Sequence, residues 1–368
     1  MGQKRTPGLV NRNGVWHIDK LYRGHRICES TGTGELAKAQ EHLTRKLEEA
    51  RQAAVFGIRP ARTFREAATK YLNENQHKRS LRDDAVHLKQ LDPYIGALPL
   101  ASVHMGTLGA FIAERRKQGV KTRTINMALQ VVRHILNVAA SEWLDEYNLT
   151  WLHAPPKIKL FRIEDARDPH PLSWDEQDRL FRELPEHLAC MALFKVNTGC
   201  REQEVCHLRW EWERWVPELN ASVFVIPAAH VKNRAKRVVV LNEAAQAVIE
   251  ARRGRHPECV FSFRGRPIAK MNNSAWQDAR KRAGLPQVRV HDLKHTFGRR
   301  LRAAGVSFED RQDLLGHKSA RITDHYSAAE IGNLVKAANK ACRQGSRKSP
   351  AKVPQTMWGT AARFGKLL

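Results

Sequence analysis

Two proline-containing stretches divide this sequence more sharply than any other feature. Residues 57–62 include one proline, and residues 153–171 include four. Proline fixes one backbone torsion and removes a hydrogen-bond donor, so neither stretch is expected to continue a helix or a central strand. The chain is therefore predicted to fold as separate modules, and its length of 368 residues fits two or three domains.

The segment before the first break predicts a small three-strand-plus-helix module over residues 1–60. Residues 14–30 are typical of short strands, and residues 22–25 have the composition of a hairpin connection. Residues 35–54 repeat leucine on one side of a helix.

An all-α module is predicted between the two breaks, over residues 62–155. Thr63 and Glu66 have the spacing of a capping box, which indicates that a helix begins there. Apolar residues recur three and four positions apart in the last helix and predict one buried stripe. The four helices are expected at residues 63–78, 82–95, 105–118 and 122–141.

Residues 165–341 are predicted to form a third, mostly helical domain with a small sheet, and residues 342–368 a basic flexible tail. A second capping box at residues 173–176 opens its first helix. Further helices are expected at residues 187–198, 291–304, 308–315 and 328–341, and strands at residues 222–226 and 237–241, with residues 259–263 as a third strand to pair with them. The predicted fold class is mainly α with small β-sheets (α+β), in a multidomain chain.

The charge balance points to a polyanionic partner. Lysine and arginine number 63 against 38 aspartate and glutamate, which gives a net charge of +25. The excess is spread over every predicted module, so nucleic acid explains it better than a single charged tail would. No uninterrupted apolar run of about 18 residues occurs, so no membrane span is expected. The six cysteines form no C-x-x-C pair and are interpreted as buried small residues in a cytoplasmic protein.

Four patches of chemically active residues lie in the third module, each weak by itself. They are Thr198 to Glu204 around Arg201, the turn at Lys232, His291 with Lys294, and Leu314 to His317 followed by Tyr326. A lone arginine or turn lysine is most often a solvated surface charge, and a lone tyrosine most often packs in a core. The four patches in this order are far more informative than any one of them.

In this order the patches resemble the tyrosine recombinase, or phage integrase, family. Its catalytic domain carries T-G-x-R-x-x-E, a lysine on a β-turn, H-x-x-R, L-G-H and a C-terminal tyrosine, and the resemblance covers residues 172–340. The upstream modules resemble the family's arm-type DNA-binding module and its helical core-binding domain. The resemblance implies six catalytic residues: Arg201, Lys232, His291, Lys294, His317 and Tyr326.

Roles for these residues follow from the resemblance. Tyr326 would attack the scissile phosphate and form a covalent 3′-phosphotyrosine, with Lys232 protonating the leaving 5′-oxygen. His291 would assist proton transfer at the tyrosine, and His317 would donate to a non-bridging oxygen. Arg201 suits the phosphate because its planar fork holds two oxygens. The phosphotyrosine retains the bond energy, so neither ATP nor a metal or other cofactor is expected.

Lys294 departs from the family pattern, which has arginine there. Lysine keeps the charge but presents one ammonium instead of a bidentate fork. A catalytically weakened DNA-binding regulator of the same family is therefore the alternative to an active enzyme, and an unrelated RNA-binding protein is a remote one.

The resemblance also implies partners and a setting. They are double-stranded DNA with specific attachment sites, a homotetramer on DNA built from monomers, and accessory DNA-bending proteins. The implied role is integration or excision of a phage or mobile element in a bacterial cytoplasm. Docking of the last helix in cis or on a neighbouring subunit stays open at this point.

Overall fold

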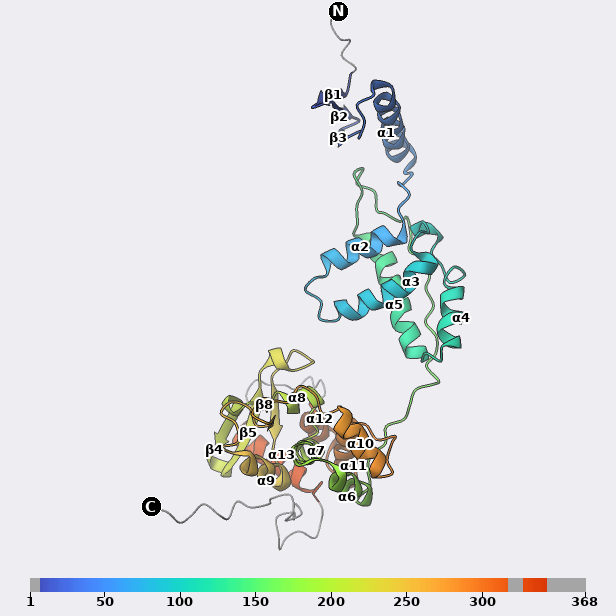
Figure 1. The fold of residues 1–368 in the computed structure, drawn as a ribbon. Coiled ribbons are helices and arrows are strands. Elements are labelled where there is room, and N and C mark those ends of the chain that lie inside the picture. The colour runs from blue at the N-terminus through green and yellow to red at the C-terminus, as the bar shows by residue number, and fades with distance from the viewer. Residues whose placement is uncertain (1–6, 317–326, 343–368) are drawn as a thin grey trace, which may run out of the picture. The chain divides into compact units, whose positions relative to one another are not determined.

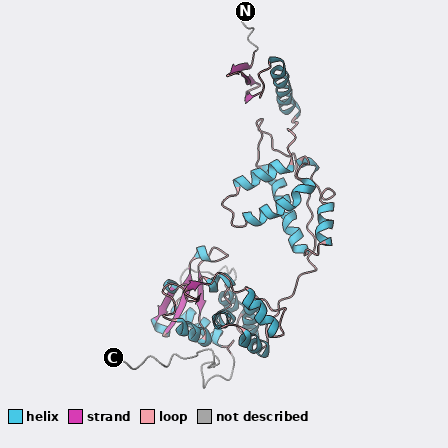
Figure 2. Ribbon diagram, viewed as in Figure 1, coloured by secondary structure: helices cyan, strands magenta, loops and turns pink. Residues whose placement is uncertain are grey.

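The computed structural model describes residues 7–316 and 327–342, and it divides into two compact units with their sequence boundary between Arg167 and Asp168 (Figure 1). Helices dominate both units, and the described strands form three small antiparallel sheets (Figure 2). The prediction of a mainly α chain with small sheets is confirmed. In the part of the chain described, no helix is both long and apolar enough to span a bilayer.

The first unit begins with a three-stranded meander and one long helix. These elements are β1 (Leu9–Arg12), β2 (Val15–Tyr22), β3 (His25–Ser30) and α1 (Leu36–Phe56). The turn from β2 to β3 holds Arg23 and Gly24 at φ 49° and 86°, as a tight two-residue hairpin requires. Leu9 and Ile18 from the sheet bury against Ala39 and Leu43 of α1.

The rest of the first unit is a helical bundle with its own core. Its helices are α2 (Phe64–Glu74), α3 (Leu81–Ile95), α4 (Gly109–Lys117) and α5 (Thr122–Ser141), with a short 3₁₀ turn at Leu100–Ser102. The capping box between Thr63 and Glu66 is present at the start of α2. The predicted stripe of α5 is buried throughout, from Ile125 to Ala139, and packs against α2, α3 and α4.

The second unit is built around α7, which is buried along most of its length. Its helices are α6 (Trp174–Glu183), α7 (Glu186–Thr198), α8 (Glu202–Cys206), α9 (Glu243–Arg252), α10 (Ser274–Arg282), α11 (Asp292–Ala303), α12 (Phe308–Leu315) and α13 (Ala328–Asn339). Short 3₁₀ turns occupy Trp210–Trp212, Pro217–Leu219 and Ala228–His230. Helices α9 and α11 pack on α7 and so bring distant segments of the sequence to it.

The small sheet of this unit corrects one strand assignment. It has the order β4 (Glu213–Val216), β5 (Ala221–Ile226) and β6 (Arg237–Val240). The prediction that residues 259–263 pair with the other two strands was wrong. Instead β7 (Ser262–Phe263) pairs with β8 (Arg266–Pro267) in a separate hairpin. Strand β4 gave no apolar alternation in the sequence because it is a short edge strand with two exposed residues in its middle.

Helix α13 packs in cis on its own unit in this single chain. Leu334, Ala337 and Ala338 join a cluster with Val240 of β6 and with the apolar side of α11 and α12. The capping box between Ser327 and Glu330 begins the helix.

Candidate active site

Two helices of the second unit end at glycines, and the last residue of one helix lies against the glycine of the other. Gly199 ends α7 and Gly316 ends α12, with φ of 61° and 58°. A side chain at Gly199 would lie 2.9 Å from Leu315, so the close approach itself requires glycine. The last carbonyls of a helix have no partner within it and carry its negative dipole end. The ends of α7 and α12 therefore supply the site with backbone carbonyls that accept hydrogen bonds.

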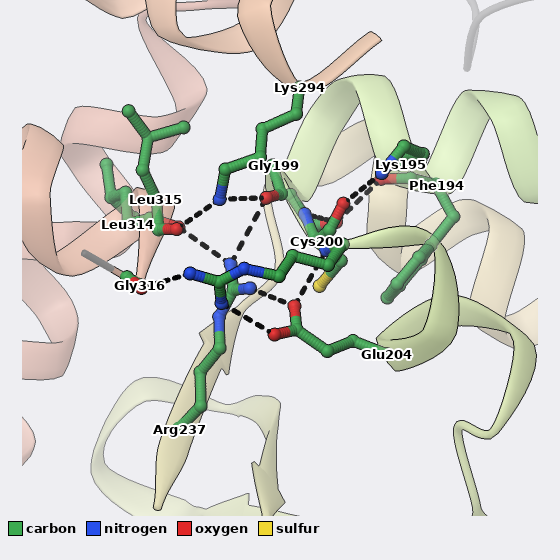
Figure 3. Close-up of polar contacts among 12 residues, drawn as sticks. Phe194, Lys195, Gly199, Cys200, Glu204, Arg237, Lys294, Leu314, Leu315 and Gly316 are labelled. Atoms are coloured by element: carbon green, nitrogen blue, oxygen red, sulfur yellow. Dashed lines mark hydrogen bonds and ion pairs between the residues drawn. The ribbon is translucent and has the colours of Figure 1, made fainter. Parts of the chain in front are cut away.

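Three cationic side chains bind these acceptors, and we call Arg201, Arg237 and Lys294 the cationic cluster. Nζ of Lys294 donates to the carbonyls of Gly199 (2.9 Å) and Leu315. Nη2 of Arg237 donates to the carbonyls of Gly199 (3.3 Å) and Leu314 (3.2 Å). Nη2 of Arg201 donates to the carbonyl of Gly316 (3.2 Å). Figure 3 shows Lys294 and Arg237 reaching Gly199 from opposite sides. The successive carbonyls of Leu314, Leu315 and Gly316, at the end of α12 and just after it, thus each accept from a different cationic side chain.

Within residues 7–316 and 327–342, Glu204 supplies the one carboxylate that binds this cluster. Its Oε1 accepts from Nη1 of Arg201 at 2.8 Å, and its Oε2 accepts from the backbone N–H of Arg201 at 2.7 Å and from Nη1 of Arg237. Burial alone would raise the pKa of Glu204, but the charge of Arg237 and the hydrogen bonds from Arg201 lower it below its ordinary value. The carboxylate therefore stays ionised, and its hydrogen bonds hold Arg201 in place.

The backbone N–H of Arg201 is not available to an anion, because it donates to Glu204 at the start of α8. Its guanidinium has five N–H donors, of which the contacts within the described residues use two. The side chain is 21% exposed, against 2–3% for Glu204 and Arg237. Arg201 therefore keeps both the donors and the exposure to bind a further group.

Two lysines lie buried in this region. Burial, together with the charges of Arg237 and Arg201, lowers the pKa of Lys294 to about 7. Burial likewise lowers the pKa of Lys195 to about 8, although its Nζ donates to the carbonyl of Cys200. A buried ammonium loses hydration that backbone carbonyls replace only in part. Both side chains are therefore able to change charge near neutral pH.

His291 immediately precedes α11 and lies within electrostatic range of these lysines. Burial of its inner side lowers the pKa of His291 to about 4, with Lys195, His295 and Lys294 acting in the same direction. Its ring lies edge-on to that of His295, with centroids 4.9 Å apart. The buried Asp292 fixes the helix start by accepting the backbone N–H of Arg289 at 2.8 Å. The imidazole of His291 is therefore neutral at pH 7, with a nitrogen able to accept a proton.

The remaining predicted residues fall in different places. Lys232 is exposed in the connection between β5 and β6, on a hairpin as the sequence indicates, and among the described residues it makes no contact with the cationic cluster. His317 and Tyr326 lie outside the described residues. The structure thus brings Arg201 and Lys294 together and sets His291 within electrostatic range of Lys294.

Sequence reasoning missed Arg237 and Lys195. Arg237 opens a β-branched strand on the same face as the buried Val239, so its inward direction was readable from the two-residue period. Lys195 interrupts the apolar run from Leu188 to Val196, where a polar residue signals an internal partner. Neither pattern says what the partner is, because the partners come from other elements.

The cysteines and the metal-ligating side chains of the described residues add no further candidate site. Cys190, Cys200, Cys206 and Cys259 are buried, as interpreted from the sequence, whereas Cys28 is exposed. Across residues 7–316 and 327–342, no three histidine, cysteine, aspartate or glutamate side chains gather so that they could hold a metal ion.

Comparison with protein-family models matches residues 172–331 to the phage integrase family. Among curated proteins, the integrase of Salmonella phage P22 is 25% identical, over 90% of this chain and 93% of that protein. The tyrosine recombinase XerA of Thermococcus kodakarensis is 26% identical, over 63% of this chain and 79% of that protein.

Solved structures show the same architecture. A lambda integrase tetramer bound to a Holliday junction superposes with a TM-score of 0.57 and 16% identity, over 88% of this chain and 99% of that one. The Tn1549 transposon integrase in complex with circular intermediate DNA gives a TM-score of 0.53 and 15% identity, over 73% of this chain and 97% of that one. At these identities the likeness establishes the fold.

Proposed function

The chain belongs to the phage integrase family of tyrosine recombinases, and from that premise we propose that it cuts and rejoins double-stranded DNA through a covalent 3′-phosphotyrosine. The observation that supports this most directly is the cationic cluster. In the part of the chain that the structure describes, it holds three cationic side chains against one carboxylate, in a buried frame of backbone carbonyls. The excess positive charge suits a phosphate that gains negative charge in the transition state.

Arg201 is proposed to bind the scissile phosphate. Glu204 and the carbonyl of Gly316 fix its guanidinium and leave three of its five N–H donors without a partner among the described residues. A guanidinium held in place loses little conformational freedom when it binds two phosphate oxygens. Lys294 adds charge next to Arg201, and its ammonium is proposed to contact the same phosphate when protonated.

The proton transfers are assigned to residues around this cluster. Tyr326 is the proposed nucleophile, and a neutral His291 is suited to take the proton that its hydroxyl releases. Lys232, exposed on its hairpin, is the proposed acid for the leaving 5′-oxygen. His317 is proposed to donate to a non-bridging oxygen. Tyr326 is then expelled when the new 5′-hydroxyl attacks the phosphotyrosine, so the step is reversible without an energy source.

The modules upstream are proposed to bind DNA. Residues 1–60 would bind arm-type sites, residues 62–155 would bind the core site, and residues 165–341 would carry out strand cleavage. Four protomers are proposed to assemble on double-stranded DNA, as the lambda integrase tetramer does on its Holliday junction. The biological role would be integration or excision of a phage or mobile element.

A nicked suicide duplex carrying the attachment site tests the proposal. The wild-type chain is expected to leave a covalent protein–DNA adduct, and Tyr326→Phe to leave none. Arg201→Gln is expected to bind DNA within a few-fold of wild type while losing the adduct, because it removes a transition-state contact. Lys281→Gln, which neutralises an exposed charge on α10, serves as the control and is expected to retain the adduct. Absence of an adduct from the wild type on its cognate site would refute the proposal.

Lys294 favours one second candidate, a DNA-binding regulator with weakened catalysis. Its ammonium is engaged by two carbonyls and is largely buried, which limits its reach to a phosphate. A regulator would bind the attachment site tightly and form no adduct. The same duplex therefore separates the two functions, and Lys294→Arg would restore the adduct if the lysine is the cause.

A further inference from the structure

Arg237 is the least expected member of the cationic cluster. It is the first residue of β6, is 4% exposed, and lies 36 residues after Arg201 in the sequence. Nothing in its immediate sequence marks it as part of a site. Yet its guanidinium contacts the carboxylate of Glu204 and the ends of both α7 and α12 (Figure 3).

The contacts of Arg237 leave it no route to a substrate. Nη1 is bound by Glu204, and Nη2 by the carbonyls of Gly199 and Leu314. Nε has no partner among the described residues, but it is fully buried beneath Gly316, where an added Cβ would lie 2.6 Å from it. Arg237 therefore cannot act as a direct phosphate ligand, and any role in cleavage must pass through its neighbours.

The neighbour it shares with Arg201 is Glu204. A carboxylate that bound Arg201 alone would pair with its charge and weaken its attraction for a phosphate. With Arg237 on Oε2, the single negative charge is divided between two arginines, and the group keeps a net positive charge. The same contact fixes the rotamer of Glu204, which in turn fixes both the backbone N–H and the guanidinium of Arg201.

We propose that Arg237 is a positioning residue for strand cleavage, which holds Glu204 so that Arg201 faces the scissile phosphate with its charge only partly compensated. This inference rests on the proposed function. It predicts that changes at Arg237 slow the chemical step and leave DNA affinity nearly unchanged, because Arg237 is buried and contributes no direct phosphate contact. A purely structural role would instead lower the amount of folded protein without changing the rate of the folded fraction.

The test uses the full chain and the nicked suicide duplex, with the single-turnover rate of adduct formation measured at saturating protein. Arg237→Lys and Arg237→Gln are expected to reduce this rate at least tenfold, with the dissociation constant for DNA within about threefold of wild type. Lysine should fail to rescue, since one ammonium cannot contact Glu204 and two carbonyls in this geometry. Arg252→Gln is the matched control, a buried arginine of α9 outside the cluster, and is expected to keep the wild-type rate.

A double variant keeps the test valid if Arg237→Gln does not fold. Removing one partner of a buried ion pair leaves an unpaired charge, whereas removing both does not. Arg237→Gln combined with Glu204→Gln is therefore expected to fold and to cleave slowly. A rate within twofold of wild type in any folded Arg237 variant would overturn the inference, as would an equal loss in Arg252→Gln. An absent adduct in the wild type would instead refute the proposed function itself.

Discussion

Replacing Lys294 by methionine tests whether the buried ammonium makes the unfolding free energy depend on pH. Methionine keeps an unbranched side chain of similar length and removes the ammonium. In the folded chain the pKa of Lys294 lies near 7, against an ordinary value of 10.5. Between these two values the unfolded chain binds a proton that the folded chain does not. Raising the pH removes that difference, so the stability of the wild type rises with pH across this window.

The expected magnitude follows from the two pKa values. Each pKa unit of difference corresponds to about 1.4 kcal/mol. Between pH 7.5 and 9.5 the wild type should gain about 2 kcal/mol of unfolding free energy relative to Lys294→Met, and between pH 5 and 6 the gain should be close to zero. The loss of the hydrogen bond to Leu315 adds an offset to the variant that does not vary with pH.

Urea unfolding followed by tryptophan fluorescence measures this difference, since Trp276 is fully buried in the core of the second unit. Subtracting the variant from the wild type at each pH cancels the titration of all other groups. Lys281→Met, at an exposed site on α10, is the control and should give a flat difference. A flat difference for Lys294→Met as well would show that the carbonyls compensate fully for burial, and the reasoning would be wrong.

Three further predictions follow from named contacts. If the ammonium of Lys294 is needed for cleavage, the rate of adduct formation should fall above about pH 7 in the wild type and stay level in Lys294→Arg, because arginine keeps its charge; parallel profiles would contradict this. Gly199→Ala should lower the unfolding free energy by about 2–3 kcal/mol, because it combines φ of 61° with clashes at 2.9 Å. Gly254→Ala is the control and should lower it by only about 1 kcal/mol, because Gly254 has φ of 74° but open space around it. Ser173→Ala should lower the unfolding free energy by about 1 kcal/mol in the same assay, because it removes the N-terminal cap of α6. No change would show that the capping box between Ser173 and Glu176 does not stabilise the fold.

Much of the secondary structure was predictable because it depends on the pattern of residues that are close together in the sequence. The buried stripe of α5, the capping boxes at Thr63 and Ser173, and the hairpin turn at Arg23 and Gly24 all depend on residues within a few positions of each other. Strand β4 escaped prediction because an exposed edge strand needs no apolar alternation. The run ending in Phe263 was misassigned because a short apolar segment is equally compatible with a core strand and with buried loop packing.

The contacts of the candidate site likewise divide into local ones, which the sequence predicts, and contacts between distant segments, which it does not. The sequence by itself determined the contact between Arg201 and Glu204, because three positions at a helix start bring the two side chains together. It also placed Lys232 on a hairpin and Lys294 in a helix. Only the tertiary structure decided that Lys294 and Arg237 meet over the carbonyl of Gly199, and that Glu204 serves two arginines. Those contacts join elements far apart in the sequence, and their strength comes from burial, which belongs to the packed core and to no single segment of the chain.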